Sequence, residues 1–93
     1  MDIKDYRILL VVTKGCVACD IQERNINEAI KQSTKNIRFE KVLRTELKNK
    51  DIMKLKLKDF PTTALFVDDV LTFKFEGSLP TPIINRYIDL YMK

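Results

Sequence analysis

The chain contains no histidine among its 93 residues, and only two cysteines and two glycines. Without an imidazole, Cys–His and Ser–His catalysis are excluded, together with most zinc and copper sites. The longest uninterrupted apolar run, residues 8–12, is far too short to cross a bilayer. No segment shows the basic, apolar and small-residue pattern of a signal peptide. We therefore expect a soluble, cytoplasmic protein with no membrane partner.

The length and composition fit one domain with a single core, because 45% of the 93 residues are apolar. No repeat, linker or low-complexity segment interrupts the chain, so we expect one domain over residues 1–93. In a reducing compartment, two closely spaced cysteines are more often catalytic or metal-binding than a permanent structural bridge.

The net charge of +4 is unevenly distributed along the chain. Residues 41–58 alone have a net charge of +5, from seven Lys and Arg residues against Glu46 and Asp51. A nucleic-acid site would interleave such charges with aromatic side chains for stacking, and this segment contains none. The pattern favours a solvated helix face over a nucleic-acid surface, with docking of an acidic protein partner as a third interpretation.

Hydrophobic patterning predicts a strand, a helix and a second strand in the first half of the chain. The run at residues 8–12 is apolar throughout, which is typical of a central strand covered on both faces. Residues 17–33 form an amphipathic pattern, with Val17, Ile21 and Ile26 on its apolar side and Cys16 at its start. A strand over residues 37–42 follows, and a right-handed crossover of this length makes the two strands parallel.

The second half predicts a shorter helix, a hairpin and a final helix. The apolar side of the helix at residues 46–55 consists of Leu47, Ile52, Met53 and Leu55. Residues 62–67 and 70–75 alternate like strands around Asp68-Asp69, which predicts a two-residue hairpin turn. Thr81 is a predicted N-cap, and Pro82 occupies the first position of a helix that extends to about residue 92.

Cys16 and Cys19 lie where the first predicted strand meets the first helix. A thiol in the first turn of a helix faces unpaired backbone N–H groups and the positive end of the helix dipole, which favours the thiolate. Cys19 lies over the same face, at a helical separation of roughly 5–6 Å, which a disulfide tolerates. One pair can therefore attack, trap and release a disulfide. The spacing alone also fits buried cysteines or half of a metal site.

Three motifs accompany this order of elements. They are Cys16-Val17-Ala18-Cys19 after the first strand, Phe60-Pro61-Thr62 before a later strand, and Gly77 between the hairpin and the last helix. With them the chain resembles the thioredoxin-like superfamily, at the size of glutaredoxins. The resemblance implies an α/β fold of order β-α-β-α-β-β-α, with a four-stranded mixed central sheet flanked by helices.

The resemblance also implies a cis peptide bond before Pro61. Such a bond would turn the backbone of Phe60 toward the cysteines, and its N–H and C=O would be free to pair with an extended substrate segment. The Phe60 side chain then either contributes to the substrate-contact surface or anchors the core.

Several residues depart from the patterns of the best-known subfamilies. Val17-Ala18 is neither the Gly-Pro of thioredoxins nor the Pro-Tyr of dithiol glutaredoxins, and Gly15 stands where a tryptophan is usual. Leu10 occupies the position at which thioredoxins bury an aspartate, so the proton of Cys19 has to leave through another group or water.

Two further departures concern the proton and glutathione. Glu40 and Lys41, on the neighbouring strand, are candidates for the group that takes the proton. Asp59-Phe60-Pro61 and Gly77-Ser78 replace the Thr-Val-Pro and Gly-Gly segments with which glutaredoxins bind glutathione, so glutathione binding stays open.

The predicted function is dithiol–disulfide exchange, in which Cys16 is the attacking thiolate and Cys19 resolves the mixed disulfide. The residues expected to contact substrate are Lys14, Gly15, Val17, Phe60, Pro61 and Gly77. We expect no resident cofactor and no metal, with glutathione as a potential co-substrate. The expected partners of this monomer are protein disulfides, and a reductase or glutathione as electron donor.

Two other classes of function fit the same sequence. The chain could be a thioredoxin-fold docking protein without turnover that binds a partner through its basic helix. It could also be a metal or iron–sulfur module in which Cys16 and Cys19 supply two thiolates to a centre shared across a dimer, because no other Cys or His exists to complete four ligands.

Overall fold

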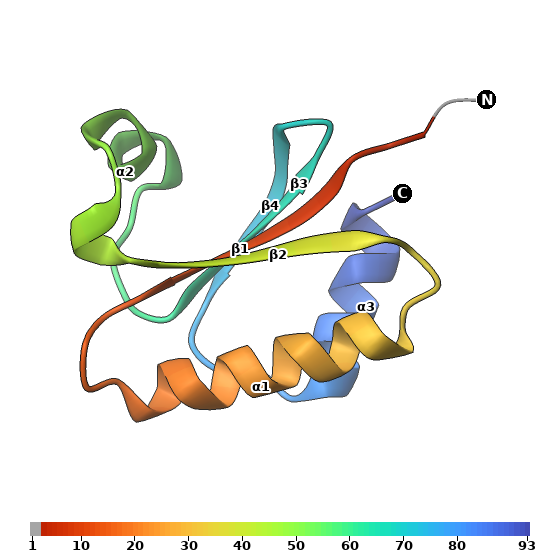
Figure 1. Ribbon diagram of the computed structural model, residues 1–93, viewed down its shortest axis with the longest axis horizontal. Helices are drawn as coiled ribbons and strands as arrows, with labels where there is room; N and C mark the ends of the chain where they lie inside the picture. The colour runs from red at the N-terminus through yellow and green to blue at the C-terminus, as the bar shows by residue number, and fades with distance from the viewer. Residues whose placement is uncertain (1–2) are drawn as a thin grey trace.

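The strand predicted to be buried on both faces lies inside a four-stranded sheet. In the computed structural model, which describes residues 3–93, this strand is β1 (Tyr6–Val12), and the sheet has the order β2-β1-β3-β4 (Figure 1). β2 (Ile37–Leu43) runs parallel to β1, whereas β3 (Thr62–Val67) runs antiparallel both to β1 and to β4 (Val70–Glu76). The predicted α/β fold with a mixed sheet is confirmed.

Helices cover both faces of this sheet. α1 (Val17–Gln32) and α3 (Thr81–Tyr91) lie on one face and α2 (Asn49–Leu55) lies on the other (Figure 1). Alternate residues of β1 therefore enter different cores: Ile8 and Leu10 pack in the core under α1 and α3, and Leu9 packs with Leu55 under α2. This placement explains why residues 8–12 are all apolar.

α1 begins as predicted, with Cys16 at its N-cap, but its buried face differs from the prediction. Val17 and Ile21, which were expected on the apolar side, are 73% and 39% exposed, whereas the polar Gln22 is fully buried. The buried side chains recur every three or four residues and so define the stripe that faces the sheet. They are Cys19, Gln22, Ile26 and Ala29. Val17 and Ile21 lie outside this stripe.

The helix predicted from residue 46 begins three residues later. A short 3-10 helix, η1 (Arg44–Glu46), comes first, and extended backbone at Leu47 and Lys48 separates it from α2. The extended backbone lets Leu47 pack against the core under α2. Met53 was predicted on the apolar side, yet it is 77% exposed, because only Leu55 of α2 is fully covered by the sheet.

Lys74 of β4 holds the end of α2 in place. Its Nζ donates to the backbone carbonyl oxygens of Leu55 and Lys56, at 2.6 Å and 3.3 Å. A cation at this end of a helix also complements the helix dipole. The short α2 is therefore attached to the far side of the sheet by a single side chain as well as by its apolar face.

The hairpin and the last helix follow the sequence closely. Asp68 and Asp69 have positive φ angles of 51° and 65°, as a two-residue turn of this kind needs, and the predicted hairpin is confirmed. α3 starts one residue earlier than predicted. Pro80 and not Thr81 is the N-cap, because the Pro80 carbonyl accepts the first helical hydrogen bonds from Ile83 and Ile84.

Candidate redox site

Cys16 and Cys19 are joined by a disulfide at the start of α1, with their Cα atoms 5.2 Å apart. The Cys19 backbone N–H donates to the Cys16 Sγ at 3.1 Å, so the sulfur caps the helix. Cys16 is half-buried, while Cys19 is only 2% exposed. An incoming reagent therefore meets Cys16 first, with Cys19 behind it.

The turn before Cys16 depends on a glycine. The chain leaves β1 at Val12 and reverses through Lys14 and Gly15, whose φ of +68° is unfavourable for other residues. Both turn residues are exposed. The strand and the helix are thus connected tightly enough to present Cys16 at the end of the sheet.

The Phe60-Pro61 segment lies at the same end of the sheet. Thr62 is paired with Val11, which places Pro61 at the level of the last residue of β1. The Phe60–Pro61 peptide bond is cis. Among residues 3–93, no hydrogen bond outside the regular helices and strands engages the N–H or C=O of Phe60. Both groups are therefore available to an extended ligand.

The Phe60 side chain anchors the core, as one of its two predicted roles requires, and its role in substrate contact stays a prediction. It is half-buried and packs against the core that Cys16 also contacts and against the core under α2. It thus anchors the two layers together at the cysteine end and keeps part of its surface open.

Gly77 connects a third segment to this site. Its N–H donates to the Pro61 carbonyl at 2.8 Å, and its φ is +84°. The loop between β4 and α3 is thereby held against the Pro61 segment. The three motifs singled out in the sequence are separated along the chain, and the structure brings them to one end of the sheet.

Two of the expected substrate contacts are exposed beside the cysteines. Val17 directly follows Cys16 and is 73% exposed, a large value for an apolar side chain. Lys14 lines a depression of about 240 Å³ whose other walls come from β2 and η1. The lining consists of Thr13, Lys14, Leu43, Arg44 and Thr45. It contains two cations and no acidic residue.

Gln22 is a further residue of the site that the sequence motifs do not identify. Its Nε2 donates to Thr63 Oγ1 at 3.0 Å, and its Oε1 accepts from the Leu79 N–H at 2.8 Å. Gln22 and Thr63 are both fully buried. The signal was present in the spacing, because Gln22 is three residues after Cys19 and lies on the same helix face.

The candidate proton-accepting groups lie on different faces of the sheet. Glu40 is ion-paired with Arg7, at 3.8 Å, on the α2 face, away from α1. Lys41 is on the α1 face, and its Nζ donates to Glu23 of α1 at 3.0 Å. Leu10 is fully buried beside Lys41 in the strand register. Of the two candidates, only Lys41 faces the cysteine helix.

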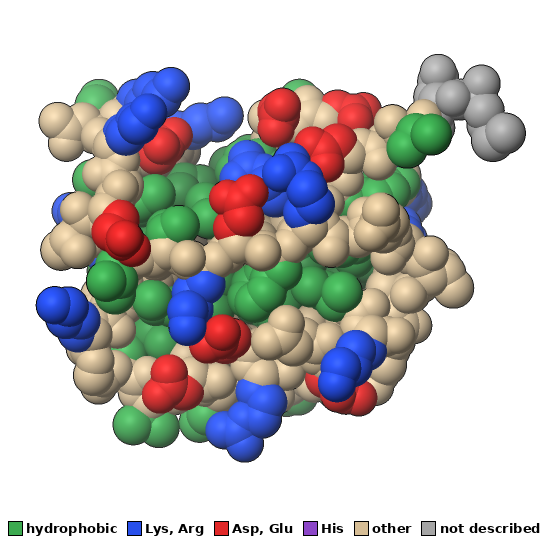
Figure 2. Space-filling model, viewed as in Figure 1, with side chains coloured by type: hydrophobic (Ala, Val, Ile, Leu, Met, Phe, Trp, Pro, Cys, Tyr) green, Lys and Arg blue, Asp and Glu red, His purple; other side chains and the backbone are tan. Residues whose placement is uncertain are grey.

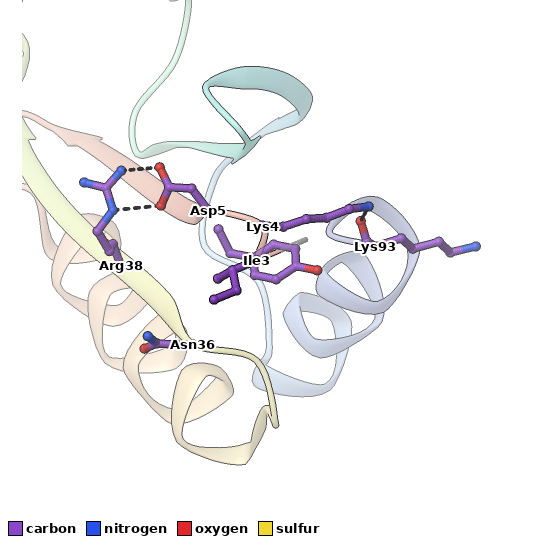
Figure 3. Close-up of a pocket in the computed structure, with 7 residues that line it drawn as sticks. Ile3, Lys4, Asp5, Asn36, Arg38 and Lys93 are labelled. Carbon is purple, nitrogen blue, oxygen red and sulfur yellow. Dashed lines mark hydrogen bonds and ion pairs between the residues drawn. The ribbon is translucent and has the colours of Figure 1, made fainter. Parts of the chain in front are cut away.

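A wider depression of about 600 Å³ lies at the opposite end of the sheet, near the chain termini (Figure 3). Arg38 Nε and Nη2 donate to the two carboxylate oxygens of Asp5, at 3.0 Å and 2.7 Å. The hydrogen bonds from Arg38 lower the pKa of Asp5, and those to Asp5 raise the pKa of Arg38. Asp5 and Arg38 of this depression therefore satisfy each other, and Lys4 donates to the Lys93 carbonyl.

Over residues 3–93, no three side chains of the metal-binding types come together as a potential metal site. None of the helices in that range has the length and apolar character to traverse a membrane.

No family model matches the chain, and neither does any curated protein. Among solved structures, malaria-parasite thioredoxin-2, described as a component of a protein secretion machinery, has 20% identity and a TM-score of 0.77. That match covers 94% of this chain and 84% of the other.

Two further solved structures match over nearly the whole chain. A second malarial protein has 20% identity and a TM-score of 0.77, over 96% of this chain and 99% of the other. Chloroplastic thioredoxin z has 15% identity and a TM-score of 0.73, over 95% of this chain and 79% of the other. These likenesses define the class: an α/β protein of the thioredoxin-like fold.

Within that class, the chain is a small protein with the fold of the thioredoxin-like superfamily and a disulfide of CxxC spacing at Cys16 and Cys19. At 15–20% identity the likeness identifies the fold. The chemistry has to be argued from the site itself.

Proposed function

We propose that the protein is a thiol–disulfide oxidoreductase whose Cys16–Cys19 dithiol reduces protein or glutathione disulfides and is itself oxidised to the Cys16–Cys19 disulfide. The observation that carries this proposal is the pairing of a half-buried, helix-capping Cys16 with a covered Cys19. In the reduced protein, the helix N-terminus stabilises the Cys16 thiolate, which is the form that attacks disulfides. The covered Cys19 is protected from outside reagents but remains within reach of Cys16.

The exchange proceeds in two balanced steps. The Cys16 thiolate attacks one sulfur of the substrate disulfide, which forms a mixed disulfide and releases the other substrate sulfur as a thiolate. Cys19, after losing its proton, attacks Cys16 Sγ, and the second substrate sulfur leaves as a thiolate. The substrate gains two electrons, its thiolates take up protons, and the protein returns to the disulfide form.

The Phe60 backbone supports the binding of an extended substrate. Its N–H and C=O are available, and they lie at the same end of the sheet as Cys16. An extended substrate segment would form main-chain hydrogen bonds with these two groups, as a strand does when it pairs over one residue. Exposed Val17 and the open part of Phe60 supply apolar contact on either side.

The rest of the cycle needs a partner and no resident cofactor. A dithiol reductase or glutathione would return two electrons to the Cys16–Cys19 disulfide, in the reducing, cytoplasmic compartment that the sequence favours. The protein would act as a monomer. Lys41 donates from its ammonium to Glu23 and therefore has no lone pair with which to take the Cys19 proton, so this proton leaves through water.

The experiment is to trap the intermediate. Cys19→Ser should form a stable mixed disulfide with a protein disulfide substrate, because no second thiol resolves it, and mass spectrometry should place the link at Cys16. Cys16→Ser should form none. If Cys16→Ser also forms the adduct through Cys19, the assigned roles are wrong.

A second arm separates exchange from docking without turnover. The double variant Cys16→Ser/Cys19→Ser should fail to reduce any protein disulfide. If this variant performs in the cell as well as the unmodified protein does, redox turnover is not the function.

A further inference from the structure

The cysteine end of the molecule has a larger excess of basic over acidic side chains than the rest of the chain. Residues 13–20 and 43–60, which form this end, contain seven Lys and Arg against four Asp and Glu, whereas the rest of the chain has ten against nine. Six of these cations define what we call the basic surface. They are Lys14, Arg44, Lys48, Lys50, Lys56 and Lys58.

Topology places the basic surface beside the cysteines. The carboxyl ends of β1 and β2 lie at the same end of the sheet, because the two strands are parallel and in register from Tyr6–Ile37 to Val12–Leu43. The segment with η1 and α2 follows β2 and leads to Phe60 and Pro61, which lie before β3 at that same end. Figure 2 shows blue side chains gathered over α2 at this end of the molecule.

None of the six cationic side chains has a partner among residues 3–93. The ion pairs in this range use Arg7, Arg38 and Lys41 as their cations, and the hydrogen bonds of the Lys and Arg side chains likewise involve none of the six. Lys54 is left out of the basic surface because it lies over the Phe66 ring, with its Nζ 5.8 Å from the centroid. Five of the six are exposed, and Arg44 is half-buried.

We propose that the basic surface docks an acidic segment of the polypeptide that carries the substrate disulfide. This proposal rests on the proposed function. Unpaired cations beside a reactive sulfur raise the local concentration of an oppositely charged partner and speed its encounter. The depression lined by Lys14, two residues before Cys16 in the chain, and Arg44 would take one carboxylate. No aromatic residue lies between Leu43 and Asp59 to stack bases, so a polypeptide fits better than a nucleic acid.

The test compares two disulfide peptides that differ only in charge. One carries Asp and Glu beside its disulfide, and in the other these residues are Asn and Gln. At low salt we expect the wild type to show about a 10-fold higher kcat/KM for the acidic peptide. This ratio should approach 1 as added salt shortens the screening length to a few ångström.

A variant with matched control identifies the surface responsible. Lys48→Glu/Lys50→Glu/Lys56→Glu should bring the ratio to about 1 or below at low salt. The control Lys31→Glu/Arg86→Glu/Lys93→Glu changes the net charge equally on exposed positions away from the cysteines, and should keep most of the preference. Equal loss in both variants would mean that net charge alone is responsible, which overturns the docking surface.

The outcomes also separate this proposal from the proposed function. Equal kcat/KM for both peptides overturns the docking proposal and leaves the oxidoreductase in place. If neither peptide is reduced, the proposed function fails. Docking is then tested separately, by measuring the affinity of the acidic peptide for the Cys16→Ser/Cys19→Ser variant with fluorescence anisotropy. Tighter binding of single-stranded RNA than of the peptide, lost in the triple Lys variant, would make the surface a nucleic-acid site.

A second inference follows from Gln22, independently of the basic surface. This buried amide ties α1 to Thr63, two residues after Pro61, and to Leu79, two residues after Gly77. The Gly77–Pro61 hydrogen bond joins the other two segments to each other. We infer that Gln22 is a positioning residue that fixes the Pro61 segment and the Gly77 loop relative to the cysteine helix.

Gln22→Met tests this role, because methionine has a similar length and neither amide group. If Gln22 positions the substrate-binding segments, KM for a protein disulfide should rise about 5- to 10-fold with a smaller change in kcat. The rate at which iodoacetamide alkylates Cys16 in the reduced protein should stay within about twofold, because that small reagent needs no Pro61 segment. Equal losses in both reactions would overturn the inference.

A control and a second readout keep the test independent of activity. Ile88→Val removes a buried methylene of α3 and serves as a variant of reduced stability with Gln22 intact. In Gln22→Met, but not in Ile88→Val, the Gly77 amide chemical shift should move toward that of a solvated glycine. An unchanged Gly77 shift would show that Gln22 does not hold the loop.

Discussion

The two ends of the sheet use polar groups in opposite ways. At the end near the termini, exposed charges face one another: Arg38 binds Asp5 through two hydrogen bonds, and Arg7 is close to Glu40 and Asp69. Figure 2 shows red and blue side chains in contact between α2 and the termini. At the cysteine end, the six cations of the basic surface have no partner among residues 3–93, and the buried amide of Gln22 is hydrogen-bonded at both Nε2 and Oε1.

This difference supports the proposed docking of a partner at the cysteine end. Exposed ion pairs stabilise a fold only slightly, so pairing at the terminal end mainly cancels the local field. A surface with unpaired cations keeps a positive electrostatic potential, which attracts an acidic partner. Beneath it, satisfied buried polar groups keep the site in one arrangement. Substitutions at each end of the sheet test this difference.

The largest expected difference between the two ends is in disulfide-reduction activity. Cys16→Ser should lower disulfide reduction by at least about 1,000-fold, since a hydroxyl does not form the mixed disulfide. Arg38→Gln, at the other end, should leave kcat/KM within about twofold. Insulin reduction followed by turbidity measures both. A large loss of activity in Arg38→Gln at unchanged stability would show that the two ends are coupled.

The next largest effect concerns the buried polar network. Thr63→Val removes the acceptor of Gln22 Nε2 and leaves a buried donor unpaired, which should cost about 1–3 kcal/mol of unfolding free energy. The control is Thr72→Val, an exposed threonine whose hydroxyl donates to the Leu65 carbonyl, with an expected cost of about 0.5 kcal/mol. Urea denaturation measures both, and equal costs would contradict the importance of the network.

A smaller effect is expected at the glycine turns around the site. Gly77→Ala forces alanine to a φ of +84°, which should cost about 1 kcal/mol, although no atom lies within 4 Å of the added methyl group. Gly15→Ala, at a φ of +68°, should cost a similar amount for the same reason. Thermal unfolding compares the two. A cost above about 3 kcal/mol would show that backbone strain is not the main term.

The smallest effect belongs to the terminal end and depends on pH. Arg38 lowers the pKa of Asp5 below its usual 3.8, so the folded state binds the Asp5 proton less tightly than the unfolded state does. The stabilisation is fully present above the unfolded pKa and is lost as the pH falls through the folded value. The melting temperature of the wild type should exceed that of Asp5→Asn slightly at pH 7.

The same pair supplies its own control. The difference between wild type and Asp5→Asn should narrow below pH 4, and added salt should reduce it at pH 7, because both groups are exposed. A difference that grows on acidification would contradict the ion-pair explanation.

The sequence predicted the fold well because its main signals are local. The unbroken apolar run of β1, the helix opened by Cys16 and the Asp68-Asp69 turn each depend on neighbouring residues, and each was found as expected. The start of α2 was wrong by three residues, because the packing of Leu47 on the sheet overrides local helix propensity.

The site was only partly accessible from the sequence. Cys16, Pro61 and Gly77 were identified through motifs, and the structure gathers them at one end. Gln22 escaped because a polar residue on an amphipathic helix is expected to face water, and its partners are more than 40 residues away in the chain. The contrast between paired and unpaired charges also requires the structure, since composition cannot show which cation meets which acid.

The central position of β1 in the sheet determines how rarely this strand opens to solvent. β1 is hydrogen-bonded to a neighbour on each side and covered on each face, and Ile8, Leu10 and Val11 are completely buried. The amide hydrogens of such a strand exchange with solvent only in the rarest, most extensive openings of the molecule, whereas those of a short peripheral helix exchange through local fraying. The cysteine pair begins four residues after the end of this strand. We expect the attachment of the cysteine pair to persist through the local openings of α2, because it depends on the most protected strand of the sheet.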